Sequence, residues 1–112
     1  MEFHRNHFCI STDYEKLNLP TIHGFLKQSY WAENIPASIV ERAVRNSLSF
    51  GLYKGEEQIG FARVITDYAT FAYLADVFIL DSYRGQGLSK WLLECVMQYP
   101  ELQGLPWCRG PQ

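Results

Sequence analysis

The sequence predicts a mixed α/β domain in which helices cover a mainly antiparallel sheet. The chain has 112 residues, which is enough for one small domain and not for two. Hydrophobic residues make up 47% of it and aromatic residues 15%, so the chain can bury a core. Along the chain, apolar residues first alternate as in a strand, then recur at helical spacing, then alternate again, and finally return to helical spacing. The predicted order is therefore strand, two helices, three strands and a helix.

The first strand is expected at residues 8–12 (FCIST), where apolar and polar residues alternate, after a polar lead-in. A helix is predicted over residues 19–30, because its apolar residues recur at helical spacing, with Thr21 as its cap. A second helix begins at about Ala37, and its apolar face extends as far as Leu48.

Three strands follow over residues 49–80. The first turn between them is KGEE, where Gly55 supplies the positive φ of a tight hairpin, and the second is DYAT. The last strand, residues 71–80 (FAYLADVFIL), is almost wholly apolar, as expected of a strand covered on both faces. Asp76 is the residue that interrupts it.

The clearest helical pattern comes after this strand. One stripe contains Leu88, Trp91, Leu92, Cys95, Val96 and Tyr99, and we expect these residues to pack on the sheet. Cys95 would then be a buried, protonated thiol and not a nucleophile. The helix should end before Pro100, since a residue preceding proline avoids helical angles. Residues 100–112 are rich in Pro and Gly and predict an irregular tail with at most a very short strand.

Composition excludes several classes of function. The net charge is -2 without a Lys/Arg stripe, so we expect no nucleic-acid partner. No apolar run approaches the roughly 20 residues of a membrane span, and the first residues lack an apolar signal core, which predicts a cytoplasmic protein. His4, His7 and Cys9 lie close together in sequence. With no second cluster to complete four ligands, we expect no metal.

The stretch between the last strand and the last helix, DSYRGQGLSK, has the composition of an anion site. A helix N-terminus has free N–H groups and a favourable dipole for negative charge. Gly85 and Gly87 leave the backbone bare, while Arg84 and Lys90 add positive charge. Neither the P-loop pattern nor the full dinucleotide fingerprint is present. Taken alone, the loop is equally compatible with a turn that only caps a helix.

The same stretch, together with the strand before it, resembles the GNAT superfamily of acyl-CoA-dependent N-acyltransferases. The family motif appears as Arg84-Gly85-Gln86-Gly87-Leu88-Ser89, with Ser89 where Gly or Ala is usual. The order of elements over residues 8–99 is also similar to that of the family.

The resemblance implies acetyl-CoA as the acyl donor and an amine as the acceptor. It assigns the pantetheine arm to the backbone of Val77, Phe78 and Ile79, and the pyrophosphate to the loop from Gly85 through Gln86, Gly87, Leu88 and Ser89 to Lys90, with Arg84 beside it. Attack by the amine needs a base, and Asp76 is the first candidate, although a buried carboxylate is more often structural. Tyr30 and Trp31 lie where the family builds its acceptor pocket, and they serve equally well as core residues. Arg63 and Tyr68 are weaker candidates.

Family members continue beyond this tail with a helix that carries a tyrosine acid, and no tyrosine follows Tyr99 here. The last long strand would then have an open edge. Three readings remain: a shortened product without catalysis, a homodimer through the strand edge, or a tail that covers the gap. We expect an N-acetyltransferase acting on a small molecule or peptide. The alternative is a catalytically inactive module that binds CoA or another partner.

Overall fold

The computed structural model describes residues 1–29 and 33–109, and its strands form one mixed sheet. The strands follow one another across the sheet in chain order, from β1 to β6. All neighbouring pairs are antiparallel except β5 and β6, which are parallel. The strands are β1 (Glu2–Arg5), β2 (Phe8–Ser11), β3 (Leu48–Lys54), β4 (Glu57–Thr66), β5 (Ala72–Ile79) and β6 (Trp107–Arg109). The predicted fold class is confirmed.

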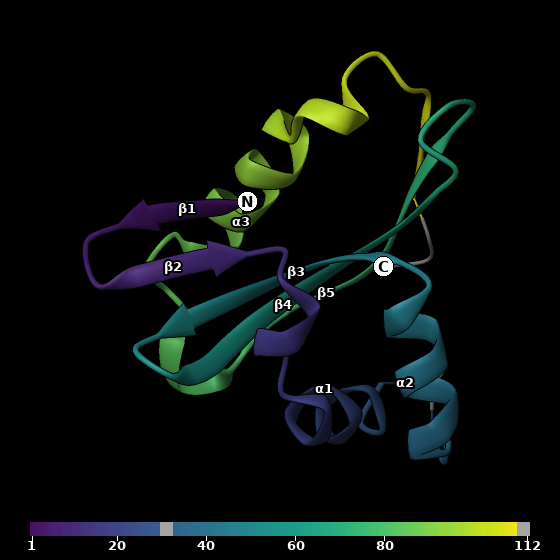
Figure 1. Cartoon of the computed structure of the whole chain (residues 1–112). Helices are drawn as coiled ribbons and strands as arrows, with labels where there is room; N and C mark the ends of the chain where they lie inside the picture. The colour runs from purple at the N-terminus through teal and green to yellow at the C-terminus, as the bar shows by residue number, and fades with distance from the viewer. Residues whose placement is uncertain (30–32, 110–112) are drawn as a thin grey trace.

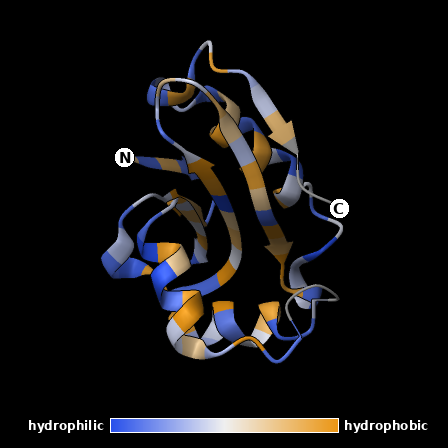
Figure 2. Ribbon diagram, turned by 90° about the vertical axis from the view of Figure 1, so that its right-hand side faces the viewer, coloured by the Kyte–Doolittle hydropathy of each residue, from blue (hydrophilic) through white to orange (hydrophobic). Residues whose placement is uncertain are grey.

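The helices lie on opposite faces of this sheet (Figure 1). The pair α1 (Leu19–Leu26) and α2 (Ala37–Arg45) covers one face, and α3 (Leu88–Gln98) covers the other. Each face has its own core cluster: Phe61 and Phe78 of the sheet lie under α1 and α2, and Leu92 of α3 belongs to the same cluster as Phe50 of β3. Apolar residues recur along the central strands, interrupted by polar ones (Figure 2). Both faces of the central sheet are therefore buried, as the apolar strand sequences predict.

The helix boundaries follow local chemistry that the sequence shows only in part. The cap of α1 is Asn18, whose side chain accepts a hydrogen bond from the Thr21 N–H at 3.0 Å. The prediction of Thr21 as the cap is therefore wrong, because Pro20 occupies the first turn and Asn18 precedes it. Leu48 belongs to β3 and not to the second helix. The predicted end of α3 before Pro100 is confirmed.

Both predicted hairpin turns are present between the central strands. Gly55 has φ 61° at the β3–β4 turn, and Tyr68 has φ 62° at the β4–β5 turn. Asp67 holds the second turn, because its carboxylate accepts hydrogen bonds from the N–H groups of Ala69 and Thr70. A carboxylate in this position replaces the backbone partners that a turn leaves unsatisfied.

The two ends of the described chain extend the sheet on both sides: the polar lead-in proves to be a strand, and the tail contains the very short strand that its sequence allows. Residues 2–5 form β1, which pairs with β2 as a hairpin and extends the sheet. After α3, a short 3-10 turn at Pro100–Leu102 leads to β6. β6 pairs with β5 only at residues 72–74, so it covers one end of the edge that was expected to be open. No helix in the described ranges is long and apolar enough to cross a bilayer.

Candidate active site

The site begins at the loop that leaves β5 and enters α3. Gly85 has φ 85° and Gly87 has φ 77°, in the left-handed region that other residues adopt only with strain. A Cβ atom at either position would have no neighbour within 4 Å, so the space beside both glycines is open. The glycines therefore serve two purposes, since they permit the turn and leave the backbone accessible.

The N-terminus of α3 has no side-chain cap. Gly87 is the N-cap residue, and no side chain of residues 1–29 or 33–109 caps the first turn. The N–H groups at the start of a helix lack intrahelical partners, and the helix dipole makes this end positive. Because the first turn opens on the space beside the glycines, it offers donors to an anion.

A cavity of about 340 Å³ lies between this helix end and the last residues of β5. Its lining comes from the end of β5, the following loop, the start of α3 and one residue of α1. It is lined by Phe25, Val77, Phe78, Ile79, Tyr83, Arg84, Gly85, Gly87, Leu88 and Ser89. The structure thus brings most of the predicted cofactor residues around one hollow. Gln86 and Lys90 are exposed and do not line it.

Arg84 stands between this cavity and a second one of about 610 Å³ beside α1. Its Nε donates a hydrogen bond to the Ile79 carbonyl at 3.2 Å and lies 3.3 Å from a carboxylate oxygen of Asp81. The side chain is 60% exposed, so its guanidinium is free to turn toward an incoming anion. Phe25 lines both cavities and stacks on Phe78 at 4.0 Å between ring centroids.

The register of β5 changes beside the cavity. Arg63 of β4 pairs with Asp76, but the next residue, Val64, pairs with Leu74, so Ala75 is an extra residue in β5. In the part of the chain that the structure describes, β6 pairs with β5 only as far as Leu74. Among the described residues, the side of β5 away from β4 therefore has no strand neighbour from the bulge onward, and an extended amide-bearing ligand can pair there.

Comparison with known proteins identifies the family. The model of the acetyltransferase (GNAT) family matches residues 13–106. This chain belongs to the GNAT family. A Gibberella zeae protein described as an inferred acetyltransferase is 34% identical, over 94% of this chain and 70% of its own.

Solved structures agree with this assignment. A crystal structure from Xanthomonas campestris pv. campestris, described as an inferred GNAT-family acetyltransferase, is 47% identical with a TM-score of 0.91. The alignment covers 95% of this chain and 76% of that one. The aminoglycoside N-acetyltransferase AAC(6')-Iy, solved in complex with CoA, shares the fold at 21% identity and a TM-score of 0.70, over 95% and 78% of the two chains.

Asp76 of this GNAT domain is buried in an ion pair that the sequence did not reveal. Its carboxylate accepts a hydrogen bond from Arg63 Nε at 2.6 Å, and the two side chains are 4% and 10% exposed. Arg63 also donates to the Ser47 hydroxyl at 3.2 Å. This pair gives Asp76 a structural role, and its role as a base stays a prediction. The sequence did not reveal this pair because neither residue belongs to a motif, and only the register of β4 and β5 places them opposite each other.

The remaining predicted residues are distributed as follows. Tyr30 and Trp31 lie outside the described residues. Tyr68 is exposed in the β4–β5 turn, away from the cavity lining. Cys95 of α3 is buried in the core between the helix and the sheet, where desolvation raises the pKa of its thiol to about 11, as expected of a thiol that does not react. Phe25 and Tyr83 line the cavity and were not predicted to do so.

Proposed function

We propose that this domain binds acetyl-CoA in the cavity between β5 and α3 and transfers the acetyl group to an amine of a small molecule or peptide. The observation that carries the proposal is the uncapped N-terminus of α3, which faces an open hollow beside two left-handed glycines. Membership of the GNAT family supports the same donor.

Binding would divide the coenzyme between two kinds of surface. The pyrophosphate would accept hydrogen bonds from the N–H groups of the loop and of the first turn of α3. Arg84 would leave Asp81 and bind a phosphate group, because a guanidinium donates two parallel hydrogen bonds to phosphate oxygens. The pantetheine arm would lie along Val77, Phe78 and Ile79, where β5 has no strand neighbour in the described structure.

The transfer needs few groups from the protein. The amine nitrogen attacks the thioester carbonyl carbon, a new C–N bond forms, and the C–S bond breaks to release CoA. A backbone N–H near Val77 would stabilise the oxyanion, since a preorganised donor acts most strongly in a desolvated site. Asp76 is our proposed acceptor for the amine proton, and the thiolate takes a proton from water or a nearby donor.

The test measures binding and turnover separately. CoA binding is followed by calorimetry and by the rise in melting temperature, and turnover is followed by thiol release from acetyl-CoA with a panel of amines. Gly87→Ala should weaken CoA binding, because its methyl group enters the hollow. Gly55→Ala is the matched control, since Gly55 is also left-handed with open space, at a hairpin outside the cavity.

The outcomes separate the two candidate functions. Binding that Gly87→Ala weakens and Gly55→Ala does not, together with thiol release, supports an acetyltransferase. Binding with the same pattern but no turnover with any amine would indicate a module that holds CoA without catalysis. If CoA neither binds nor stabilises the domain, or if both glycine variants behave alike, the proposed site is wrong.

A further inference from the structure

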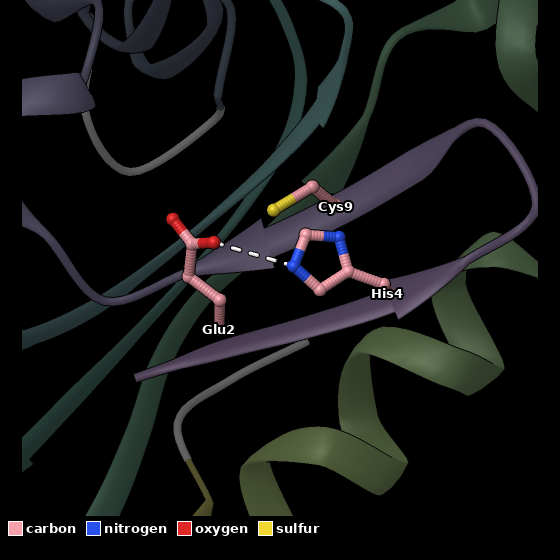
Figure 3. A group of neighbouring side chains, drawn as sticks. All are labelled: Glu2, His4 and Cys9. Atoms are coloured by element: carbon pink, nitrogen blue, oxygen red, sulfur yellow. Dashed lines mark ion pairs between the residues drawn. The ribbon is translucent and has the colours of Figure 1, made fainter.

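A second cluster of chemically active side chains lies on the β1–β2 hairpin, outside the cavity described above. Glu2 and His4 project from β1, and Cys9 projects from β2 (Figure 3). His4 and Cys9 are directly opposed in the register, and Glu2 lies two residues before His4. Because side chains alternate between the faces of a strand, all three lie on the same face.

The donor atoms of these residues are close enough to share one ion. Glu2 Oε1 and His4 Nε2 are 3.3 Å apart, and one ligand atom from each of the three residues lies within 4.8 Å of the others. Ligands at about 2.0–2.3 Å from a tetrahedral Zn²⁺ are about 3.3–3.8 Å from one another. The observed spacing therefore needs only small rotations of side chains. Glu2 and His4 are exposed, so these rotations are not hindered by packing.

The surroundings leave room for an ion and its water. A cavity of about 360 Å³ adjoins the cluster, lined by Cys9, Lys16, Tyr53, Gly55 and Glu56. Tyr53 lies opposite Cys9 on β3, and its buried hydroxyl has no hydrogen-bond partner among the described residues. A polar group of this kind can hydrogen-bond to a metal-bound water.

We propose that the hairpin binds one Zn²⁺ ion through Glu2, His4 and Cys9, with water as the fourth ligand. Carboxylate, imidazole and thiolate are all zinc ligands, and three protein ligands plus water form an open site. The sequence alone grouped His4, His7 and Cys9 and predicted no metal. The hairpin register instead brings Glu2 to the cluster, and His7 lies outside it.

Two features of the metal-free protein must change when the ion binds. Burial and the charge of Glu2 raise the pKa of Cys9, so the residue is a thiol before binding. Zn²⁺ forms a Zn–S bond and the thiol proton passes to the buffer. Lys16 forms an ion pair with Glu2, and its ammonium must give up that carboxylate to the metal. Lys16 is therefore a competitor of the ion.

The experiment uses the full chain without a histidine tag, freed of metal by a chelator. Zn²⁺ is titrated by calorimetry, and Co²⁺ serves as the spectroscopic probe because thiolate ligation produces charge-transfer absorption. We expect one ion per chain. Loss of a residue that only hydrogen-bonds to a metal ligand typically weakens metal affinity by about 10- to 100-fold. His4→Ala removes a ligand itself and should therefore weaken Zn²⁺ binding by more than about tenfold. His7→Ala, on the same hairpin, should leave the affinity unchanged.

The cysteines supply a second matched pair. Cys9→Ser should abolish the Co²⁺ charge-transfer absorption, and Cys108→Ser, at an exposed thiol, should retain it. Lys16→Gln should tighten Zn²⁺ binding, a gain that a purely structural role of the cluster would not produce. The proposal fails if His4→Ala and His7→Ala behave alike, if the absorption survives Cys9→Ser, or if Lys16→Gln does not raise the affinity. Circular dichroism of each variant distinguishes a lost ligand from a lost fold.

Discussion

Replacing Asp76 by leucine tests the buried ion pair that the structure places beside the β5 bulge. The change removes the carboxylate and leaves the Arg63 guanidinium without its partner. Both side chains are at most 10% exposed, so solvent offers the remaining charge little compensation. Removing one partner of a buried pair costs about 3–5 kcal/mol. For a domain of this size, that corresponds to a fall in melting temperature on the order of 10–20 °C.

The double variant Arg63→Met with Asp76→Leu should recover most of this stability. Replacing both charged groups by apolar residues of similar volume is often neutral, because no unpaired charge remains. Urea unfolding of the wild type, the two single variants and the double variant gives the coupling free energy. Glu41→Gln is the control, since Glu41 and Arg45 are exposed and 3.9 Å apart, and such pairs contribute at most about 1 kcal/mol.

Turnover by the same variants separates structure from catalysis. If Asp76 accepts the amine proton, the stable double variant should still lose about 10²–10⁴-fold in kcat, which is the usual contribution of a general base. If Asp76 only holds Arg63 in place, the double variant should recover turnover together with stability. If Asp76→Leu alone lowers the free energy of unfolding by less than about 1 kcal/mol, the reasoning is contradicted, because an unpaired buried guanidinium should destabilise the fold by more than that.

Three further predictions concern the loop, a turn and a packed glycine. Asp81→Asn should tighten CoA binding by about 1.5- to 5-fold in calorimetry, because it frees Arg84 from an exposed pair of about 0.2–1 kcal/mol. Hydrogen bonds, first that of the Thr70 side chain, hold the pKa of the Asp67 carboxyl well below its usual range. The stability that Asp67 contributes to the fold is therefore complete above its unfolded pKa of about 3.9 and is lost as the pH falls below that value. Asp67→Asn should therefore flatten the loss of stability below about pH 4 in acid titrations of unfolding. Gly51→Ala should lower the free energy of unfolding in urea by about 1–3 kcal/mol, because its Cβ would clash with the buried Tyr53 hydroxyl oxygen. Gly24→Ala, in open space on α1, should instead raise it by up to about 1 kcal/mol.

The last helix and its loop show how far sequence reasoning reaches. The stripe from Leu88 to Val96 is set by helical periodicity, and the structure buries it under the sheet as predicted. The left-handed angles of Gly85 and Gly87 are local properties, because glycine adopts a positive φ without strain. Most of the predicted cofactor residues meet at one cavity for the same reason, since a strand, a tight turn and a helix N-terminus are consecutive in the chain.

Pairings between distant residues were beyond that reasoning. Arg63 and Asp76 are 13 positions apart, and they meet only because the β4–β5 register places them opposite each other. Phe25 reaches the cavity because α1 packs on β5, and this contact leaves no trace in the sequence around either residue. The polar segment before β2 was interpreted as a lead-in, because four residues without clear alternation do not identify a strand.

By itself, the sequence determined the fold class, the central hairpins, the last helix and the bare glycine loop, because each depends on neighbours within a few positions along the chain. The tertiary structure alone decided which side chains face one another: the partner of Asp76, the aromatic wall of the cavity and the Glu2–His4–Cys9 cluster. These depend on strand register and on helix packing, where a shift of one residue turns a side chain to the opposite face of the sheet.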